Sequence, residues 1–239
     1  MALNSQSSLV VLPPTRVILT QSGSPGQSDS YGNGDPACRQ DDRGERQHDM
    51  KLVVFDAMGV LYSAGDDESE WLIPYLREQG CRLDFADIHQ AYEEASIGHL
   101  TSAEFWQVCG VRGDDQTYCS RHTLTSGMDS LLADLSRAGV RMACLSNDVY
   151  KWSRILRVRF GLEKWISTWV ISGDIGARKP DPEAFHILAE RTDVPLNTMV
   201  FFDDAQRNID AALNLGMDAV GFMTVDACRL DLRTRGFQI

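Results

Sequence analysis

Short apolar segments that alternate with helix-like segments are the feature that most restricts the fold of this chain. The apolar segments cover 51–55, 141–145, 168–171, 199–202 and, more weakly, 219–222, and their length and composition are typical of buried strands. Helical patterns cover 128–138, 149–159, 182–191 and 206–215. Because strands that alternate with helices form a parallel sheet covered on both faces, the pattern predicts an α/β fold.

The ends of the predicted helices carry residues that favour capping. Asp148 and Asp181 stand where each can accept hydrogen bonds from the first backbone N–H groups of a helix, and Pro182 suits a first helical turn. Gly139 and Gly216 each follow a helical pattern, where a glycine commonly ends a helix. These residues support the predicted boundaries of the elements.

Segment 67–126 breaks the alternation. It has helical patterns around 68–79, 84–97 and 102–109 and no convincing strand, so it predicts a small helical lobe inserted after the first strand. Its aromatic residues recur at helical spacing, which is more typical of a packed core than of a ligand cage; they are Trp71, Tyr75, Tyr92 and Trp106.

Residues 1–49 differ in composition from the rest of the chain. Segment 20–49 has almost no large apolar residue, so it cannot bury enough surface to offset the entropy cost of ordering. We therefore expect residues 1–49 to be either a disordered tail or an over-extended start, with Met50 as the initiator. Pro13 and Pro14 interrupt the apolar residues of 8–19 and no basic segment precedes them, so no export signal is predicted.

The overall composition excludes some classes of partner. The formal net charge is −11 at pH 7, and no basic stripe of the kind that binds nucleic acid is present. No stretch of the sequence is long and apolar enough to predict a membrane span. The six cysteines form no C-x-x-C pair and no zinc-type cluster, which indicates a reducing, cytoplasmic setting without disulfides. The oligomeric state is left open.

Polar residues stand where two of the predicted strands end. Asp56 follows the first strand, and Ser146 and Asn147 follow the second. In an open parallel sheet, ligands bind outside the carboxyl ends of the strands. Each residue alone could instead have an ordinary structural role, because an aspartate can cap a turn and a serine can begin a helix.

Two further polar segments add a cation and a pair of carboxylates. Lys179 lies in a loop between Gly176 and Pro180, although a solvated lysine is the ordinary alternative for a loop. Asp203 and Asp204 directly follow the fourth strand. Adjacent carboxylates repel each other unless a cation binds them, so this pair indicates a metal site.

Taken in order, these segments resemble the four motifs of the haloacid dehalogenase-like superfamily of hydrolases. The motifs read F-D-A-M-G-V-L, L-S-N-D, K-P-D-P and F-F-D-D-A-Q-R-N, and the resemblance covers about 51–223. It implies a Rossmann-like, doubly wound parallel sheet built from 50–66 and 127–239, with a helical cap at 67–126. It also implies a small-molecule phosphorylated substrate that the cap selects.

The resemblance further implies a nucleophile and a magnesium site. Asp56 is the residue that would attack phosphorus and form an aspartyl-phosphate. Magnesium would be held by Asp56, the backbone carbonyl of Met58 and Asp204, with Asp203 close by. Hard oxygen ligands of this kind suit that ion.

The remaining motif residues would bind the phosphate. The resemblance assigns Ser146, Asn147 and Lys179 to the phosphoryl oxygens of the substrate, with Lys179 also counted as catalytic. Asn208, one helical turn beyond the acidic pair, would orient that pair.

One position departs from the pattern of the phosphatases. They usually carry a second aspartate, as general acid and base, two residues after the nucleophile, and here that residue is Met58. A thioether cannot donate or take a proton at neutral pH. We therefore expect aryl and acyl phosphates, whose leaving groups depart as anions, to react faster than alkyl phosphates.

Two alternatives to a phosphatase stay open. Dehalogenases of the superfamily also lack the second aspartate and use the carboxylate to attack carbon without a metal, but the Asp203–Asp204 pair disfavours such a site. A catalytically silent binding or regulatory domain would keep the fold and lose turnover. The presence of Asp56, Lys179 and Asp204 disfavours such a silent domain.

Overall fold

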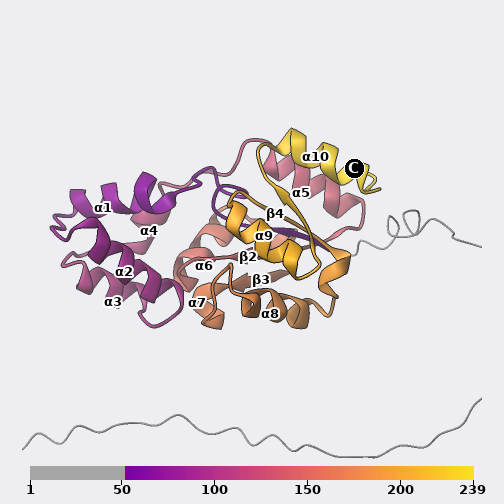
Figure 1. Ribbon diagram of the computed structural model, residues 1–239. Coiled ribbons are helices and arrows are strands. Elements are labelled where there is room, and N and C mark those ends of the chain that lie inside the picture. The colour runs from indigo at the N-terminus through magenta and orange to yellow at the C-terminus, as the bar shows by residue number, and fades with distance from the viewer. Residues whose placement is uncertain (1–51) are drawn as a thin grey trace, which may run out of the picture. The chain divides into compact units, whose positions relative to one another are not determined.

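Five parallel strands form the centre of the computed structural model, which describes residues 52–239 (Figure 1). The strands are β1 (Leu52–Phe55), β2 (Arg141–Ser146), β3 (Thr168–Ile171), β4 (Met199–Asp203) and β5 (Asp218–Gly221). All five apolar segments of the sequence are therefore confirmed as strands. The predictions for residues 1–49 and Met50 lie outside the described residues.

The order of the strands in the sheet is β3-β2-β1-β4-β5, and every pair is parallel. The chain builds outward from β1 to β3 on one side, then returns to place β4 on the other side of β1. In such a sheet the ligand site lies at the carboxyl ends of the strands where the order reverses. Here that point is between β1 and β4, and the all-parallel sheet confirms the α/β, Rossmann-like class.

Alternate residues of β1 pack on opposite faces of the sheet, as the two-residue period of a strand requires. Leu52 and Val54 belong to the apolar cluster that contains residues of α8 (Pro182–Thr192) and α9 (Gln206–Asn214). Val53 and Phe55 belong to the cluster on the other face, with α5 (Met128–Arg137), α6 (Tyr150–Arg159) and α10 (Val225–Thr234). The sheet is therefore covered on both faces, as predicted.

The other elements are short or lie in the inserted segment. They are η2 (Glu68–Leu72), α1 (Ile73–Glu78), α2 (Phe85–Ser96), α3 (Ser102–Val108), α4 (Asp115–Cys119), η3 (Leu162–Lys164), α7 (Ser172–Ile175) and η4 (Leu196–Thr198). The three helical patterns predicted between the first two strands are thus present, and α4 is an additional helix.

Three of the predicted caps are confirmed and one is wrong. Asp181 accepts a hydrogen bond from the backbone N–H of Glu183 at the start of α8. Gly139 and Gly216 follow α5 and α9 with positive φ values of 73° and 83°. Asp148 does not cap α6, since the helix begins after Val149 and the Asp148 carboxylate is buried with no hydrogen-bond partner among the described residues.

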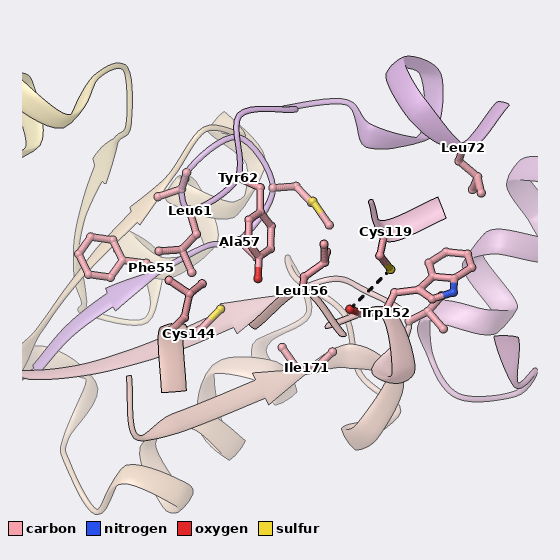
Figure 2. Packing of buried hydrophobic residues seen from close by; sticks show 14 of the residues in the cluster. Phe55, Ala57, Leu61, Tyr62, Leu72, Cys119, Cys144, Trp152, Leu156 and Ile171 are labelled. Atoms are coloured by element: carbon pink, nitrogen blue, oxygen red, sulfur yellow. Dashed lines mark hydrogen bonds between the residues drawn. The ribbon is translucent and has the colours of Figure 1, made fainter. Parts of the chain in front are cut away.

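The inserted helices α1–α4 share their core with the sheet domain. Trp152 of α6 is 1% exposed and packs against Tyr92, Trp106 and Tyr118 of the inserted helices, and Figure 2 shows it beside Cys119. The predicted packing of the aromatic residues in this segment is confirmed for Tyr75, Tyr92 and Trp106, which are at most 5% exposed.

A buried carboxylate ties the inserted helices to α6. Asp115 of α4 accepts hydrogen bonds from the indole N–H groups of Trp152 at 2.7 Å and Trp106 at 2.9 Å. Lys151 of α6 places its ammonium 2.7 Å from the same carboxylate. These contacts fix α4 against α6, so the inserted helices are anchored at this end.

The cysteines of the described part of the chain are free thiols, and Cys144 lies buried in β2. Within residues 52–239, no helix is long and apolar enough to span a membrane.

Candidate active site

The carboxyl ends of β1 and β4 bring three aspartates together. Asp56 directly follows β1, Asp203 is the last residue of β4 and Asp204 comes next. These strands are neighbours, with Phe55 paired to Phe202. As a result, one carboxylate oxygen from each aspartate lies within 4.8 Å of the others.

Lys179 joins two of these carboxylates. Its ammonium nitrogen Nζ lies 2.8 Å from Asp56 Oδ1 and 2.7 Å from Asp203 Oδ2, and its side chain is 1% exposed. Burial alone would lower the pKa of Lys179, but the carboxylates of Asp203 and Asp56 outweigh it and raise the pKa above its ordinary value. The lysine is therefore a fixed cation directly beside the carboxylate of Asp56.

Asn147 holds the loop that carries this lysine. Its side-chain Nδ2 donates to the carbonyl of Lys179 and its Oδ1 accepts from the N–H of Lys179, both at 2.8 Å. The Asn147 side chain therefore positions the backbone of Lys179. The predicted contact between Asn147 and phosphate stays a prediction.

Asp203 is fully occupied by protein partners. It is 0% exposed and accepts hydrogen bonds from Lys179, from Asn208 Nδ2 at 3.0 and 3.1 Å, and from the N–H of Ala205 at 2.8 Å. Burial would raise the pKa of Asp203, but Lys179 and these donors hold it below its ordinary value. The ionised form of Asp203 is thus favoured, its carboxylate holds Lys179, and Asn208 orients it.

Asp204 is exposed, and its carboxylate lies against the backbone of two glycines. A Cβ on Gly59 would lie 2.1 Å from Asp204 Oδ2, and a Cβ on Gly65 would lie 2.9 Å from it. Gly59 also has a positive φ of 71°, which residues with a side chain rarely adopt. The segment after Asp56 can therefore approach Asp204 only because these positions are glycines.

The charges of this cluster are not balanced by the protein alone. Burial raises the pKa of Asp56 to about 7; Lys179 lowers this value, and the negative charge of Asp203 raises it. Burial and the charge of Asp203 also raise the pKa of Asp204. A bound cation would oppose both shifts, and hard carboxylate oxygens this close together are the donor set that magnesium prefers.

The remaining predicted residues lie around this cluster. Ser146 is 2% exposed at the end of β2, and its hydroxyl has no hydrogen-bond partner in the described part of the chain. It is not a lining residue of the cavity at the site, whereas its neighbour Asn147 is. Met58 is 7% exposed and does line that cavity.

The cavity that contains Asp56 has a volume of about 330 Å³ and is lined by both the sheet domain and the inserted helices. Its walls include lining residues that the motifs did not identify; among them are Asp67, Glu68, Phe85, His89, Tyr92 and Arg178. Arg178 donates a hydrogen bond to the Ser96 hydroxyl of α2 and lies over the Tyr92 ring. The position of Arg178 directly before Lys179 was the one signal in the sequence that could have identified Arg178 as a residue of the cavity.

The fold agrees with the comparison to protein families. The model of the haloacid dehalogenase-like hydrolases matches residues 50–216, and the chain belongs to this family of hydrolases.

Among curated proteins, the chain is similar to the phosphoglycolate phosphatase of Pseudomonas syringae pv. tomato, with 25% identity over 186 residues, 71% of this chain and 68% of that protein. It is also similar to the phosphoserine phosphatase of Thermus thermophilus, with 32% identity over 101 residues, 42% of this chain and 41% of that protein. The fold resembles that of a family enzyme from Bacteroides thetaiotaomicron crystallised with magnesium. The TM-score is 0.64 at 20% identity, covering 77% of this chain and 99% of that one.

Proposed function

We propose that this chain is a magnesium-dependent phosphoric-monoester hydrolase that works through an aspartyl-phosphate on Asp56. The observation that carries the proposal is the cluster of Asp56, Asp203 and Asp204, with Lys179 2.8 Å from Asp56, at the cavity between the sheet and the inserted helices. The phosphatases among the relatives support it.

In this proposal, Asp56 attacks phosphorus and Lys179 neutralises the oxygens of the transferring phosphoryl group. Ser146 and the backbone of Asn147 bind the same oxygens. Magnesium would be held by Asp56, Asp204 and the backbone carbonyl of Met58, and when bound it would offset the negative charge that the phosphate brings.

We further propose that residues 67–126 act as a cap over a core formed by 50–66 and 127–239. Helix α2 of this cap lines the cavity through Phe85, His89 and Tyr92. A cavity of about 330 Å³ suits a small phosphorylated molecule. The cysteine pattern supports a cytoplasmic location, and the acidic charge supports the absence of a nucleic-acid partner.

A substrate panel tests the proposed function. Aryl phosphates, alkyl phosphates and 2-haloacids are incubated with the full chain, with magnesium and again with a chelator. Release of phosphate that requires magnesium is the expected result. Release of halide from 2-haloacids in the presence of chelator, without phosphatase activity, would show that the chain is a dehalogenase.

Asp204→Asn should weaken magnesium binding while the chain stays folded. Loss of even an outer-shell partner typically lowers metal affinity about 10–100-fold, so loss of a direct carboxylate ligand should lower it at least about tenfold. Calorimetric titration with magnesium measures this, and the exposed Asp210→Asn on α9 is the matched control. Equal magnesium affinity of the Asp204→Asn variant and the wild type would refute the metal assignment.

A further inference from the structure

The proposed reaction has no proton donor at the usual position, but the cavity offers another carboxyl. Met58 and Asp67 line the cavity together with Asp56. The thioether of Met58 cannot take part in proton transfer. Asp67 is 7% exposed and lies directly before η2, where the inserted helices begin.

The chain folds back on itself after β1, and this brings Asp67 near the acidic cluster. The N–H of Gly59 donates to the carbonyl of Ala64 at 2.6 Å. Gly65 then lies against Asp204, because a Cβ on Gly65 would be 2.9 Å from Asp204 Oδ2. Successive Cα atoms are about 3.8 Å apart, so the Cα of Asp67 is within about 7.6 Å of the Cα of Gly65. Asp67 therefore lies two residues from a glycine that contacts Asp204, and it lines the same cavity as Asp56 and Asp204.

Asp67 is held by a tyrosine of the inserted helices. The O–H of Tyr118, on α4, donates to Asp67 Oδ2 at 3.2 Å, and Tyr118 is 1% exposed. The titratable groups that face Asp67 come from four places: Asp66 and Glu68 beside it, Asp148 after β2, Tyr92 of α2 and Tyr118 of α4.

This environment raises the pKa of Asp67, so that it holds its proton to higher pH than an ordinary carboxyl. Burial raises the pKa of Asp67 from 3.8 to about 7; the hydrogen bond from Tyr118 lowers this value, and the charges of Glu68 and Asp66 raise it. A general acid and base is most effective when its pKa lies near the working pH. A strongly shifted carboxyl in a cavity beside a nucleophile is a typical sign of function.

Other titratable groups near the cavity suit proton transfer less well. The side chain of His89 is 44% exposed, and its Nδ1 lies 2.8 Å from Glu68 Oε2, so these two groups are engaged with each other. Burial raises the pKa of Tyr92 well above 10, so it cannot take part as a base at neutral pH. Asp148 is buried and is not a lining residue of the cavity.

Resting on the proposed phosphatase function, we propose that Asp67 is the general acid and base of the reaction, in place of the aspartate that Met58 replaces. In the first step, Asp56 bonds to phosphorus, the bond to the leaving oxygen breaks, and the proton of Asp67 moves to that oxygen. In the second step, water bonds to phosphorus, the bond to Asp56 breaks, and a proton of the water returns to Asp67. An alcohol and phosphate are released, and both carboxyls return to their starting states.

Asp67→Asn tests this proposal in the full chain with magnesium. The kcat/KM for an alkyl phosphate should fall about 10²–10⁴-fold, which is the usual contribution of a positioned acid–base group. Nitrophenyl phosphate needs no proton to release its leaving group, so its first step should persist. Because the base for the second step is missing, one nitrophenol per enzyme should appear as a burst before slow turnover.

The control is Asp87→Asn, which makes the same substitution at an exposed position of α2. This variant should keep both activities and show no burst. Asp67→Asn should fold normally, since a neutral amide replaces a carboxyl that is costly to bury when ionised.

The pH profile gives a second readout. For the wild type, kcat/KM for the alkyl phosphate should fall above pH 7 as Asp67 loses its proton, and Asp67→Asn should lack this decline. Tyr118→Phe removes a hydrogen bond that favours ionised Asp67, so the decline should move to higher pH. If either residue had only a structural role, its substitution would not shift the pH at which kcat/KM declines.

The outcomes separate this proposal from the proposed function. If wild-type phosphatase activity depends on Asp56 while Asp67→Asn keeps its alkyl-phosphate activity and pH profile, Asp67 is not the acid. If Asp67→Asn fails to fold, an unchanged pH profile in Tyr118→Phe overturns the proposal and a shifted one supports it. A wild type without any Asp56-dependent phosphatase activity contradicts the proposed function itself.

Discussion

Asp56→Asn is expected to abolish hydrolysis of phosphate esters and leave the fold intact. The amide lacks the anionic oxygen that attacks phosphorus, and loss of a nucleophile typically costs about 10⁴-fold or more in kcat. The amide oxygen can still accept the hydrogen bonds that Asp56 Oδ1 now accepts from the N–H of Ala57 at 2.6 Å and from Lys179 at 2.8 Å. The melting temperature without magnesium should therefore not decrease.

The measurement is phosphate release under saturating substrate and magnesium, together with mass spectrometry to exclude deamidation of the new asparagine. Asp210→Asn, at an exposed position, is the control for the substitution itself. After brief incubation with an aryl phosphate and acid quenching, the wild type should carry one added phosphoryl group and the variant none. Turnover of Asp56→Asn above about one percent of wild type would exclude Asp56 as the nucleophile.

The sheet and the motif residues could be predicted from the sequence because both depend on local pattern. Each strand is a short apolar segment, and parallel strands place their carboxyl ends at one edge of the sheet. That geometry alone brings Asp56 near Asp203, and Lys179 reaches both because its loop is held by Asn147. The loop contact itself was not visible in the sequence.

Other features depend on packing that no local pattern reports. Asp148 stands at an ordinary N-cap position, but its carboxylate is buried and the helix begins one residue later. In the sequence, Asp67 is one of several acidic residues in a polar segment, and nothing distinguishes it from the others. Its place at the cavity and its burial depend on the fold of 59–65 and on the contact with Tyr118.

Three helices were missed for different physical reasons. Helix α4 has five residues and α7 has four, so neither is long enough to repeat an apolar pattern over two turns. Helix α10 could have been found, because Val225, Cys228 and Leu232 recur at helical spacing, are buried, and follow the capping residue Thr224. Its apolar residues are few and charged residues separate them, which weakens the pattern.

Lys179→Met is expected to lower both stability and activity, and the loss of stability should grow with pH. The substitution keeps an unbranched side chain but removes the cation between two buried carboxylates. Removal of one partner from a buried ion pair typically costs about 3–5 kcal/mol. Loss of this contact to the phosphoryl group should also lower kcat at least about 10²-fold.

The sign of the pH effect follows from Asp203. In the wild type its pKa lies below the unfolded value of 3.8, so its contribution is present above that value and is lost as the pH falls. Without Lys179, burial dominates and raises the pKa of Asp203 above 3.8. The folded variant then binds more protons than the unfolded chain, and its free energy of unfolding decreases as the pH rises.

Denaturant unfolding at pH 5 and pH 8 with chelator measures this difference. The gap in unfolding free energy between wild type and Lys179→Met should be wider at pH 8, and added magnesium should narrow it by supplying a cation to the same carboxylates. The matched control is Lys151→Met, which removes the ion pair between Lys151 and Asp115. The side chain of Lys151 is 61% exposed. Such an exposed lysine contributes at most about 1 kcal/mol, and Asp115 keeps its hydrogen bonds from Trp106 and Trp152. A loss in Lys179→Met no larger than in this control, or one independent of pH, would show that Lys179 does not balance the buried carboxylates.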